Sequence, residues 1–385
     1  RAMYYLHVFG AVAHSHKDDR MMMVLPLYHA TGGLCGVGAA LCYGRAVIVR
    51  RKFSATKFWD DAVETGATLF MYVGELCRFL VAADPVPAEK THKIRAAIGN
   101  GLRPDVWPRF AERTGIERII EFYGATEGNV GLINLDSKPG AIGRVPPHLS
   151  KRFNIKLVRF DTEKEEVVRD KNGRAIECEP DEVGEAIGEI RSDDARYRFD
   201  GYQDEEATKK KILRDVFAPG DVYFRTGDLM KRDKQGYFYF VDRIGDTFRW
   251  KGENCSTNEV GEQLNGFEAL ASANVYGVEI PGTNGRAGMA ALILKSDTFD
   301  VEAFSAHVES TLPSYARPIF LRIQHDQETT STFKLVKKTL REEGYDLSKV
   351  GGDSLFVLKP GSSTYEPLTR EYFEIIQRGE GGVME

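Results

Sequence analysis

Residues 121–127 read Glu121-Phe122-Tyr123-Gly124-Ala125-Thr126-Glu127 and are the most informative run of the chain. An apolar strand, predicted from Ile119 to Tyr123, leads into a small-residue turn that ends in a hydroxyl and a carboxylate. Open α/β sheets bind ligands at the carboxyl ends of their strands. There, Gly124 and Ala125 let the backbone approach a phosphate. Thr126 can donate to a phosphate oxygen and Glu127 can hold Mg²⁺, although an ordinary strand-to-helix turn with Thr-Glu at a helix start is the alternative.

Three further segments carry polar side chains in the same kind of place. Arg225-Thr226-Gly227-Asp228 follows an aromatic strand predicted at Val222–Phe224, and a carboxylate fixed by a tight turn suits the paired hydroxyls of a ribose. Asp242-Arg243-Ile244-Gly245-Asp246 follows a second aromatic strand and leads into Arg249-Trp250-Lys251-Gly252-Glu253-Asn254. Near the end, Thr329-Thr330-Ser331-Thr332-Phe333-Lys334 places one lysine after a hydroxyl-rich loop.

In this order and spacing, the segments resemble the adenylate-forming enzymes, the superfamily of acyl-CoA synthetases, luciferases and peptide-synthetase adenylation domains. Four longer runs are similar to the fatty acid transport proteins, also called very-long-chain acyl-CoA synthetases. They are Tyr72–Arg78 (YVGELCR), Gly99–Arg103 (GNGLR), Gly245–Asn254 (GDTFRWKGEN) and Tyr315–Phe320 (YARPIF). The resemblance extends over essentially the whole chain.

The resemblance implies a nucleotide site built from several of these segments. Thr126 and Glu127 would bind the AMP phosphate and Mg²⁺, next to Gly124 and Ala125. Lys334 would be the mobile cation of acyl-adenylate formation, because a lysine brings a point charge to crowded phosphates without demanding bidentate geometry. The remaining nucleotide contacts would be Gly99, Asn100 and Gly101 against the adenine, Tyr123 stacked on it, and Asp228 and Arg243 on the ribose hydroxyls. The neighbours Lys337 and Lys338 look like surface residues.

The same resemblance assigns the acyl and thiol parts of the reaction. His29 and Gly33 would border the acyl channel, although close helix packing explains the glycines of that segment equally well. The loop Gly252-Glu253-Asn254 would serve the CoA step after the small domain has rotated, with Gly245 absorbing the backbone change. Many members have a second glycine where Lys251 stands, and often a glycine where Phe333 stands.

Composition and cysteine usage indicate an ordinary globular protein of a reducing compartment. With 42% hydrophobic and 28% charged residues, the 385-residue chain is typical of a soluble globular protein of two or three domains. A net charge of −5 gives no reason to expect a nucleic-acid partner. The five cysteines show neither a CxxC pair nor metal-ligand spacing with histidine, so we expect a reducing compartment.

Residues 21–44 carry no formal charge and are long enough to cross a bilayer. They include Pro26, His29 and five glycines, so we predict a buried strand at Met22–Leu27, a ligand-facing loop and a Gly/Ala-rich helix instead of a membrane span. The chain begins at Arg1 inside a predicted helix and lacks the Thr/Ser/Gly-rich phosphate loop that the resemblance implies just upstream. We therefore expect a fragment of a longer protein.

The pattern along the chain predicts an α/β fold of the adenylate-forming type. Strand-like runs alternate with helical patterns from 20 to 127, which indicates a parallel sheet covered by helices. A β-rich subdomain is predicted at about 150–242, so that residues 1–242 form the remainder of the large AMP-binding domain. Residues 243–385 would form a small mobile α+β domain, with Asp242–Asp246 as the hinge.

These expectations lead to one principal function and two kinds of alternative. The principal one is ATP- and Mg²⁺-dependent activation of long- or very-long-chain fatty acids to acyl-CoA, in a protein peripherally associated with the plasma or endoplasmic reticulum membrane. Within the enzyme class, transfer to a carrier protein or activation of another bulky carboxylate stays open, as does a homodimer. The other class is a membrane-associated fatty acid uptake or binding protein in which catalysis is secondary or absent.

Overall fold

A computed structural model of the protein describes residues 2–13, 16–125, 128–162, 164–194, 196–283, 285–296, 298–325 and 337–380. The chain forms two compact units, which are described separately. Unit 1 comprises Arg1–Phe240 with Ser331–Phe333, and unit 2 comprises Val241–Thr330 with Lys334–Glu385.

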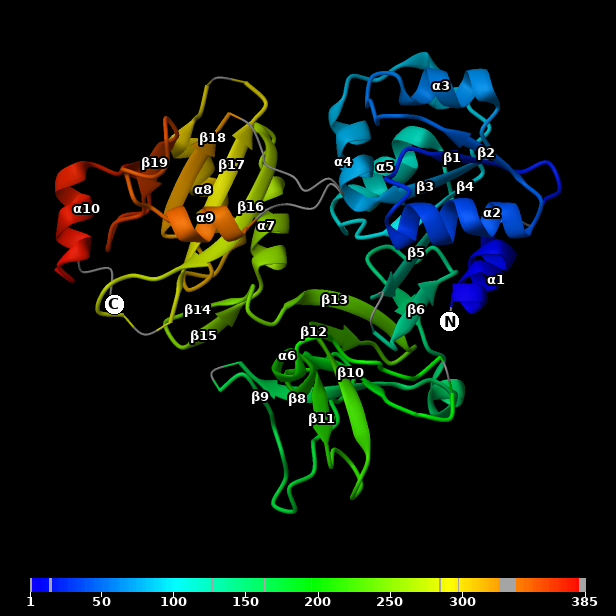
Figure 1. The fold of residues 1–385 in the computed structure, drawn as a ribbon. Coiled ribbons are helices and arrows are strands. Elements are labelled where there is room, and N and C mark those ends of the chain that lie inside the picture. The colour runs from blue at the N-terminus through cyan, green and yellow to red at the C-terminus, as the bar shows by residue number, and fades with distance from the viewer. Residues whose placement is uncertain are drawn as a thin grey trace. The chain divides into compact units, whose positions relative to one another are not determined.

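A six-stranded sheet in the order β2-β1-β3-β4-β5-β6 forms the first part of unit 1 (Figure 1). Its first five strands are parallel, and only β6 runs antiparallel to its neighbour. The strands are β1 (Arg20–Met23), β2 (Ala46–Val49), β3 (Leu69–Val73), β4 (Ala96–Asn100), β5 (Arg118–Gly124) and β6 (Gly131–Asn134). The carboxyl ends of the five parallel strands therefore share one edge of the sheet, which we call the carboxyl edge.

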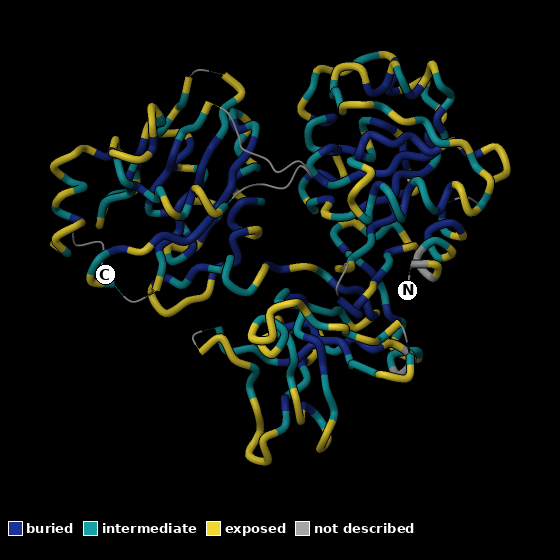
Figure 2. Tube along the Cα trace, viewed as in Figure 1, coloured by how far each residue is buried: buried dark blue, intermediate teal, exposed yellow. Residues whose placement is uncertain are grey.

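The parallel strands are buried because helices connect and cover them. Met21, Met22 and Met23 of β1 are completely buried, and Figure 2 shows the centre of this sheet in the buried colour. The helices of this part are α1 (Ala2–Ala13), the π-helix η1 (Ala30–Gly38), α2 (Ala39–Cys42), α3 (Phe58–Thr65), α4 (Gly74–Ala82), the 3₁₀ helix η2 (Pro87–Lys90) and α5 (Val106–Thr114).

A second sheet completes unit 1, in the order β7-β13-β12-β10-β8-β9 with β11 paired to β12. Glycines with positive φ, Gly173 (76°) and Gly236 (85°), make the turns that Asn172-Gly173 and Gln235-Gly236 predict. The elements are β7 (Gly143–Arg144), η3 (Pro147–Arg152), β8 (Ile155–Asp161), β9 (Glu166–Val167), β10 (Gly184–Glu189), α6 (Glu205–Lys210), β11 (Ile212–Arg214), β12 (Val222–Arg232) and β13 (Tyr237–Arg243).

Unit 2 has its own core, in which Tyr276, Phe304 and Phe320 are completely buried. A two-stranded hairpin, β14-β15, precedes a five-stranded sheet in the order β16-β17-β18-β19-β20. The elements are β14 (Phe248–Trp250), β15 (Glu253–Cys255), α7 (Thr257–Asn265), β16 (Leu270–Val278), β17 (Ala287–Leu294), α8 (Val301–Thr311), β18 (Phe320–Gln324), α9 (Lys338–Glu343), β19 (Ser354–Val357), β20 (Glu366–Pro367) and α10 (Arg370–Gln377).

The uncharged segment at 21–44 differs from its prediction in two respects. β1 ends at Met23, not Leu27, in front of Pro26, whose missing N–H cannot continue the ladder. The helix that follows is a π-helix, Ala30–Gly38, which is wider than an α-helix. Among the described residues, no helix combines the length and apolar character that a membrane crossing requires.

Candidate active site

The predicted adenine segment lies at the carboxyl end of β4. Gly99 and Asn100 are the last residues of that strand, and Gly101, with a φ of 79°, makes the turn that follows it. A Cβ on Gly99 would lie 2.2 Å from the Tyr72 carbonyl oxygen. Neighbouring chain therefore packs directly against this segment, and a larger residue at Gly99 would displace it.

Glu121 on β5 holds this turn from the neighbouring strand. Its side chain is 1% exposed, and its Oε1 accepts hydrogen bonds from the backbone N–H groups of Gly101 and Leu102, the latter at 3.1 Å. Its Oε2 accepts from the Tyr72 hydroxyl at 2.5 Å. Burial raises the pKa of Glu121 to about 8, against the opposing effect of these three donors.

Asn100 offers a polar atom that the rest of the site leaves free. Its Oδ1 is buried and has no hydrogen-bond partner among the described residues. A buried acceptor without a partner is costly, so native structures usually pair it with protein, water or ligand. An exocyclic amino group, such as that of adenine, is a donor that would satisfy it.

Tyr123 and Asp228 come together at the meeting point of the two sheets of unit 1. The Tyr123 hydroxyl on β5 donates to Asp228 Oδ2 on β12 at 2.5 Å. Gly124 and Ala125 follow Tyr123 and are exposed. The structure therefore brings the predicted stacking residue, the predicted ribose carboxylate and the phosphate turn into one neighbourhood.

The prediction of a tight turn around Asp228 is wrong. β12 continues from Val222 to Arg232, and Arg225–Asp228 lies inside it. The positive φ of Gly227, 78°, and the break in register between β10 and β12 show a bulge at this point. A bulge changes the direction of side chains as a turn does, which explains why the sequence of this segment resembles that of a turn.

The predicted acyl segment follows the carboxyl end of β1. His29 is exposed and forms the N-cap of η1, where its carbonyl accepts a hydrogen bond from the Gly33 N–H at 2.8 Å. A Cβ on Gly33 would lie 2.0 Å from the Leu27 carbonyl oxygen. Gly33 therefore lets η1 pack closely against the backbone at Leu27, which is the alternative to an acyl channel given above.

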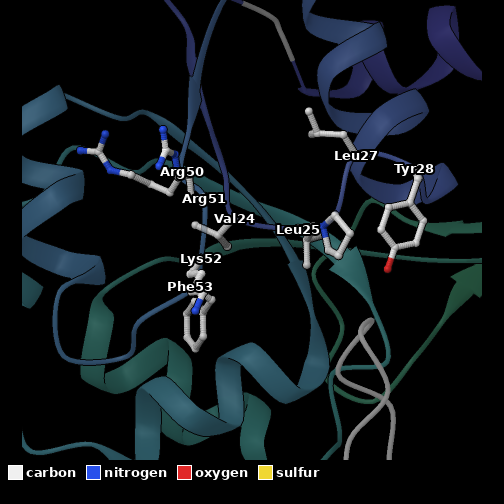
Figure 3. Close-up of a pocket in the computed structure, with 9 residues that line it drawn as sticks. Val24, Leu25, Leu27, Tyr28, Arg50, Arg51, Lys52 and Phe53 are labelled. Carbon is white, nitrogen blue, oxygen red and sulfur yellow. The ribbon is translucent and has the colours of Figure 1, made fainter.

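A pocket of about 560 Å³ lies beside this segment, between the chain that follows β1 and the chain that follows β2 (Figure 3). The chain after β1 lines it with apolar and aromatic residues, and the chain after β2 lines it with three basic residues and Phe53. Arg50 is paired with Asp61 at 2.9 Å. The lining residues are Val24, Leu25, Pro26, Leu27, Tyr28, Arg50, Arg51, Lys52 and Phe53. Such a lining suits an anion with an apolar body.

The remaining described site residues belong to unit 2. Arg243 is the last residue of β13, the strand within which unit 1 ends at Phe240 and unit 2 begins at Val241. Lys251 and Gly252 form the tip of the β14-β15 hairpin with φ values of 53° and 80°, and Glu253 and Asn254 follow as exposed residues of β15. Positive φ at both tip residues is the geometry of a type I′ turn, which favours glycine at each. The turn therefore explains the glycine that many superfamily members have at position 251.

Three predicted residues, Thr126, Glu127 and Lys334, lie outside the described residues, and their roles remain predictions. In the described ranges, no three His, Cys, Asp or Glu side chains gather as a metal site would require. The Mg²⁺ prediction therefore continues to depend on Glu127 alone.

Comparison with known proteins identifies the relatives of this chain. Residues 2–176 match the AMP-binding enzyme family. Long-chain fatty acid transport protein 1 of Homo sapiens is 42% identical over 380 residues, which is 98% of this chain and 58% of that protein. Long-chain fatty acid transport protein 6 of Mus musculus is 43% identical over 97% of this chain and 60% of its own length. The chain is related to the long-chain fatty acid transport protein family. It spans a little over half the length of these relatives.

Solved structures show the fold. ATP-bound MatB from Rhodopseudomonas palustris aligns with a TM-score of 0.71 and 23% identity over 90% of this chain and 65% of its own. O-succinylbenzoate coenzyme A synthetase of Bacillus subtilis, in complex with AMP, aligns with a TM-score of 0.65 and 22% identity over 90% and 64%. The fold is thus that of the adenylate-forming enzymes, as the fatty acid transport protein resemblance predicts.

The environments of two charged residues, the buried Glu121 and the largely buried Lys337, were not predicted from the sequence. Glu121 was read only as part of a strand, although an acid within the apolar run Ile119–Tyr123 is itself a signal of a buried role. Lys337 was predicted to be a surface residue and is not: its side chain is 18% exposed. The prediction for its neighbour Lys338, 86% exposed, agrees with the structure. No local pattern separates these two lysines.

Proposed function

We propose that this chain is part of an AMP-forming ligase that activates long- or very-long-chain fatty acids to acyl-CoA. The observation that carries the proposal is the 42% identity to long-chain fatty acid transport proteins over 98% of the chain. The geometry of the carboxyl edge supports it, because the free Asn100 Oδ1 and the Tyr123–Asp228 pair offer polar contacts of the kind that a nucleotide needs.

The reaction would proceed in two balanced steps. The fatty acid carboxylate attacks the α-phosphorus of ATP, which breaks the α–β phosphoanhydride bond and yields acyl-AMP and pyrophosphate. The CoA thiolate then attacks the acyl carbonyl and releases AMP. Bound Mg²⁺ would neutralise phosphate charge, with Glu127 as its protein ligand.

The residues of this chain would act mainly by positioning and electrostatics. Asn100 would accept from the adenine amino group and Tyr123 would stack on the ring. Asp228, held by the Tyr123 hydroxyl, would accept hydrogen bonds from the ribose hydroxyls, which Arg243 would also contact. Lys334 would supply the positive charge of the first step.

The pocket beside His29 supports a fatty acid as the substrate. Its apolar wall at Leu25, Leu27 and Tyr28 matches an acyl chain, and its cations match a carboxylate. We propose that the acid approaches the carboxyl edge through this pocket. A peripheral association with membranes would bring such substrates to it.

The deciding assay is pyrophosphate release with palmitate and lignocerate, with and without CoA, in a chain extended to the length of its relatives. We expect release that CoA accelerates, and its loss in Lys334→Ala. Unchanged release in that variant would contradict the assigned role of Lys334.

The word transport in the relatives' names favours fatty acid uptake as the second candidate. Fatty acid import by cells that express the variants Glu127→Ala and Lys334→Ala separates the two. Import that survives the loss of both residues supports uptake without catalysis, whereas import that falls together with pyrophosphate release supports the ligase.

A further inference from the structure

A partly buried network of charged groups in unit 2 joins the end of β13 to the start of α9. It involves Asp242 and Asp246 on one side and Lys337 and Arg341 on the other, with Thr257 between them. None of these side chains belongs to the nucleotide contacts proposed above. The network is therefore a structural feature that the proposed mechanism leaves unexplained.

Asp242 is the most deeply buried member, with 1% exposure. Its Oδ2 accepts from the Thr257 N–H at 2.6 Å and from the Thr257 hydroxyl at 2.8 Å. Its Oδ1 accepts from the N–H of Arg243 at 2.9 Å and from the Asn258 amide at 3.2 Å. The carboxylate thus sits in the first turn of α7, where a negative charge is favoured, and fixes the backbone at Arg243.

Lys337 completes the network from the other side. Its Nζ donates to the Thr257 hydroxyl at 2.7 Å and lies 3.8 Å from Asp246 Oδ2. Because the Thr257 hydroxyl donates in turn to Asp242, the ammonium group and the buried carboxylate are linked through one hydroxyl. Arg341, one turn further along α9, forms a second ion pair with Asp246.

We propose that Lys337 is a positioning residue, which anchors the start of α9 to the Asp242–Asp246 segment and so limits the reach of Lys334. The inference rests on the proposed function. Three residues of chain span at most about 11 Å, so an anchored Lys337 limits the positions open to residue 334. Asp242, which the anchor holds, also accepts a hydrogen bond from the backbone N–H of Arg243, another predicted nucleotide contact of unit 2.

Electrostatics explain why the contact made by Lys337 matters although Arg341 also pairs with Asp246. Burial lowers the pKa of Lys337 and raises that of Asp242, whereas their mutual attraction opposes both shifts. Removing the lysine leaves the buried Asp242 carboxylate without its nearby cation, which is much less favourable than the intact network. Asp246 keeps its ion pair with Arg341. The segment would then move to rehydrate Asp242, and the start of α9 would shift from its place.

The test compares Lys337→Met with Lys338→Met in a chain extended to the length of its relatives. Lys338 is the matched control, because it is the adjacent lysine and its side chain is 86% exposed. We expect Lys337→Met to lower kcat for pyrophosphate release about 100-fold, the loss that a displacement of about 1 Å causes, while KM for ATP changes less than about threefold. Lys337→Arg should recover part of the rate, and Lys338→Met should match the wild type.

A Lys337→Met protein with the kcat of the control overturns the inference, and so does a rise in KM with kcat unchanged. If Lys337→Met does not fold, Thr257→Val serves instead, because it removes the hydroxyl that links Lys337 to Asp242. We expect the same fall in kcat, though smaller, and wild-type kcat in Thr257→Val overturns the inference.

Hydrogen exchange measured without nucleotide separates this inference from the proposed function. The amides of Arg243 and Thr257 should exchange faster in Lys337→Met and at the wild-type rate in Lys338→Met. Faster exchange in Lys337→Met together with a wild-type kcat would show that Lys337 anchors the segment without positioning Lys334. This result overturns the inference and leaves the proposed function intact. A wild-type protein that releases no pyrophosphate overturns the proposed function and, with it, this inference.

Discussion

Replacing Glu121 with glutamine should change how the stability of unit 1 depends on pH. In the folded chain burial raises the pKa of Glu121 to about 8, compared with an ordinary value of 4.5. At 1.36 kcal/mol for each pKa unit, this difference means that ionisation of Glu121 lowers the free energy of unfolding by about 5 kcal/mol.

The sign follows from the direction of the shift. A group whose pKa is raised on folding contributes stability that is complete below its unfolded pKa and is lost as pH rises through its folded pKa. The wild type should therefore lose stability relative to Glu121→Gln by about 1.4 kcal/mol per pH unit between pH 4.5 and 8, and the difference should level off above pH 8. Any constant effect of the amide on the contact with Tyr72 cancels, because the slope is the quantity measured.

Urea unfolding at several pH values, followed by tryptophan fluorescence, provides the assay. Trp250→Phe in the background leaves Trp59 and Trp107, both buried in unit 1, as the reporters. Glu117→Gln is the control, because it removes an exposed carboxylate of unit 1 and leaves the buried one. A stability difference between Glu121→Gln and the wild type that stays constant from pH 5 to pH 8 would refute the reasoning.

Three further predictions concern the same unit. Gly99→Ala places a methyl group 2.2 Å from the Tyr72 carbonyl oxygen, so calorimetry should show a loss of about 1–3 kcal/mol and titration should show weaker AMP binding. Tyr123→Ala should weaken AMP binding by about 1–3 kcal/mol through lost stacking, whereas Tyr123→Phe, which keeps the ring and loses only the bond to Asp228, should weaken it less; equal losses would argue against stacking. Cys42 is the exposed thiol and the other four cysteines are buried, so native alkylation followed by mass spectrometry should label Cys42 first, and early labelling elsewhere would contradict the packing.

Local patterns were sufficient to predict the parallel sheet. Ala46–Val49 and Arg118–Tyr123 read as strands because short β-branched or apolar runs alternate with helical spacing, and the structure has β2 and β5 there. Serine favours the N-cap of a helix, so Ser54 would predict a helix start at that position, but α3 begins at Phe58. The amides of Lys57 and Phe58 bond to the Ser54 carbonyl, so a turn precedes the helix and the serine side chain does not cap it.

The site was predictable only where a motif carried it. Tyr123 and Asp228 were named from motifs, but 105 residues separate them and no single sequence indicates that they touch. Likewise, the buried environments of Glu121 and Lys337 come from tertiary contacts with Tyr72 and Thr257, which lie 49 and 80 residues away. Tertiary packing decides which of several charged residues becomes buried, and local composition does not record it.

The π-helix Ala30–Gly38 has a consequence for how this protein lineage can change. A π-turn holds one more residue than an α-turn, so a single-residue deletion converts one into the other. That deletion would rotate the preceding and following side chains relative to each other by about 100°. One inherited deletion could therefore present a new set of side chains beside His29 while every strand of the sheet keeps its register. Substrate range could diverge among descendants in this way without any point substitution in the pocket itself.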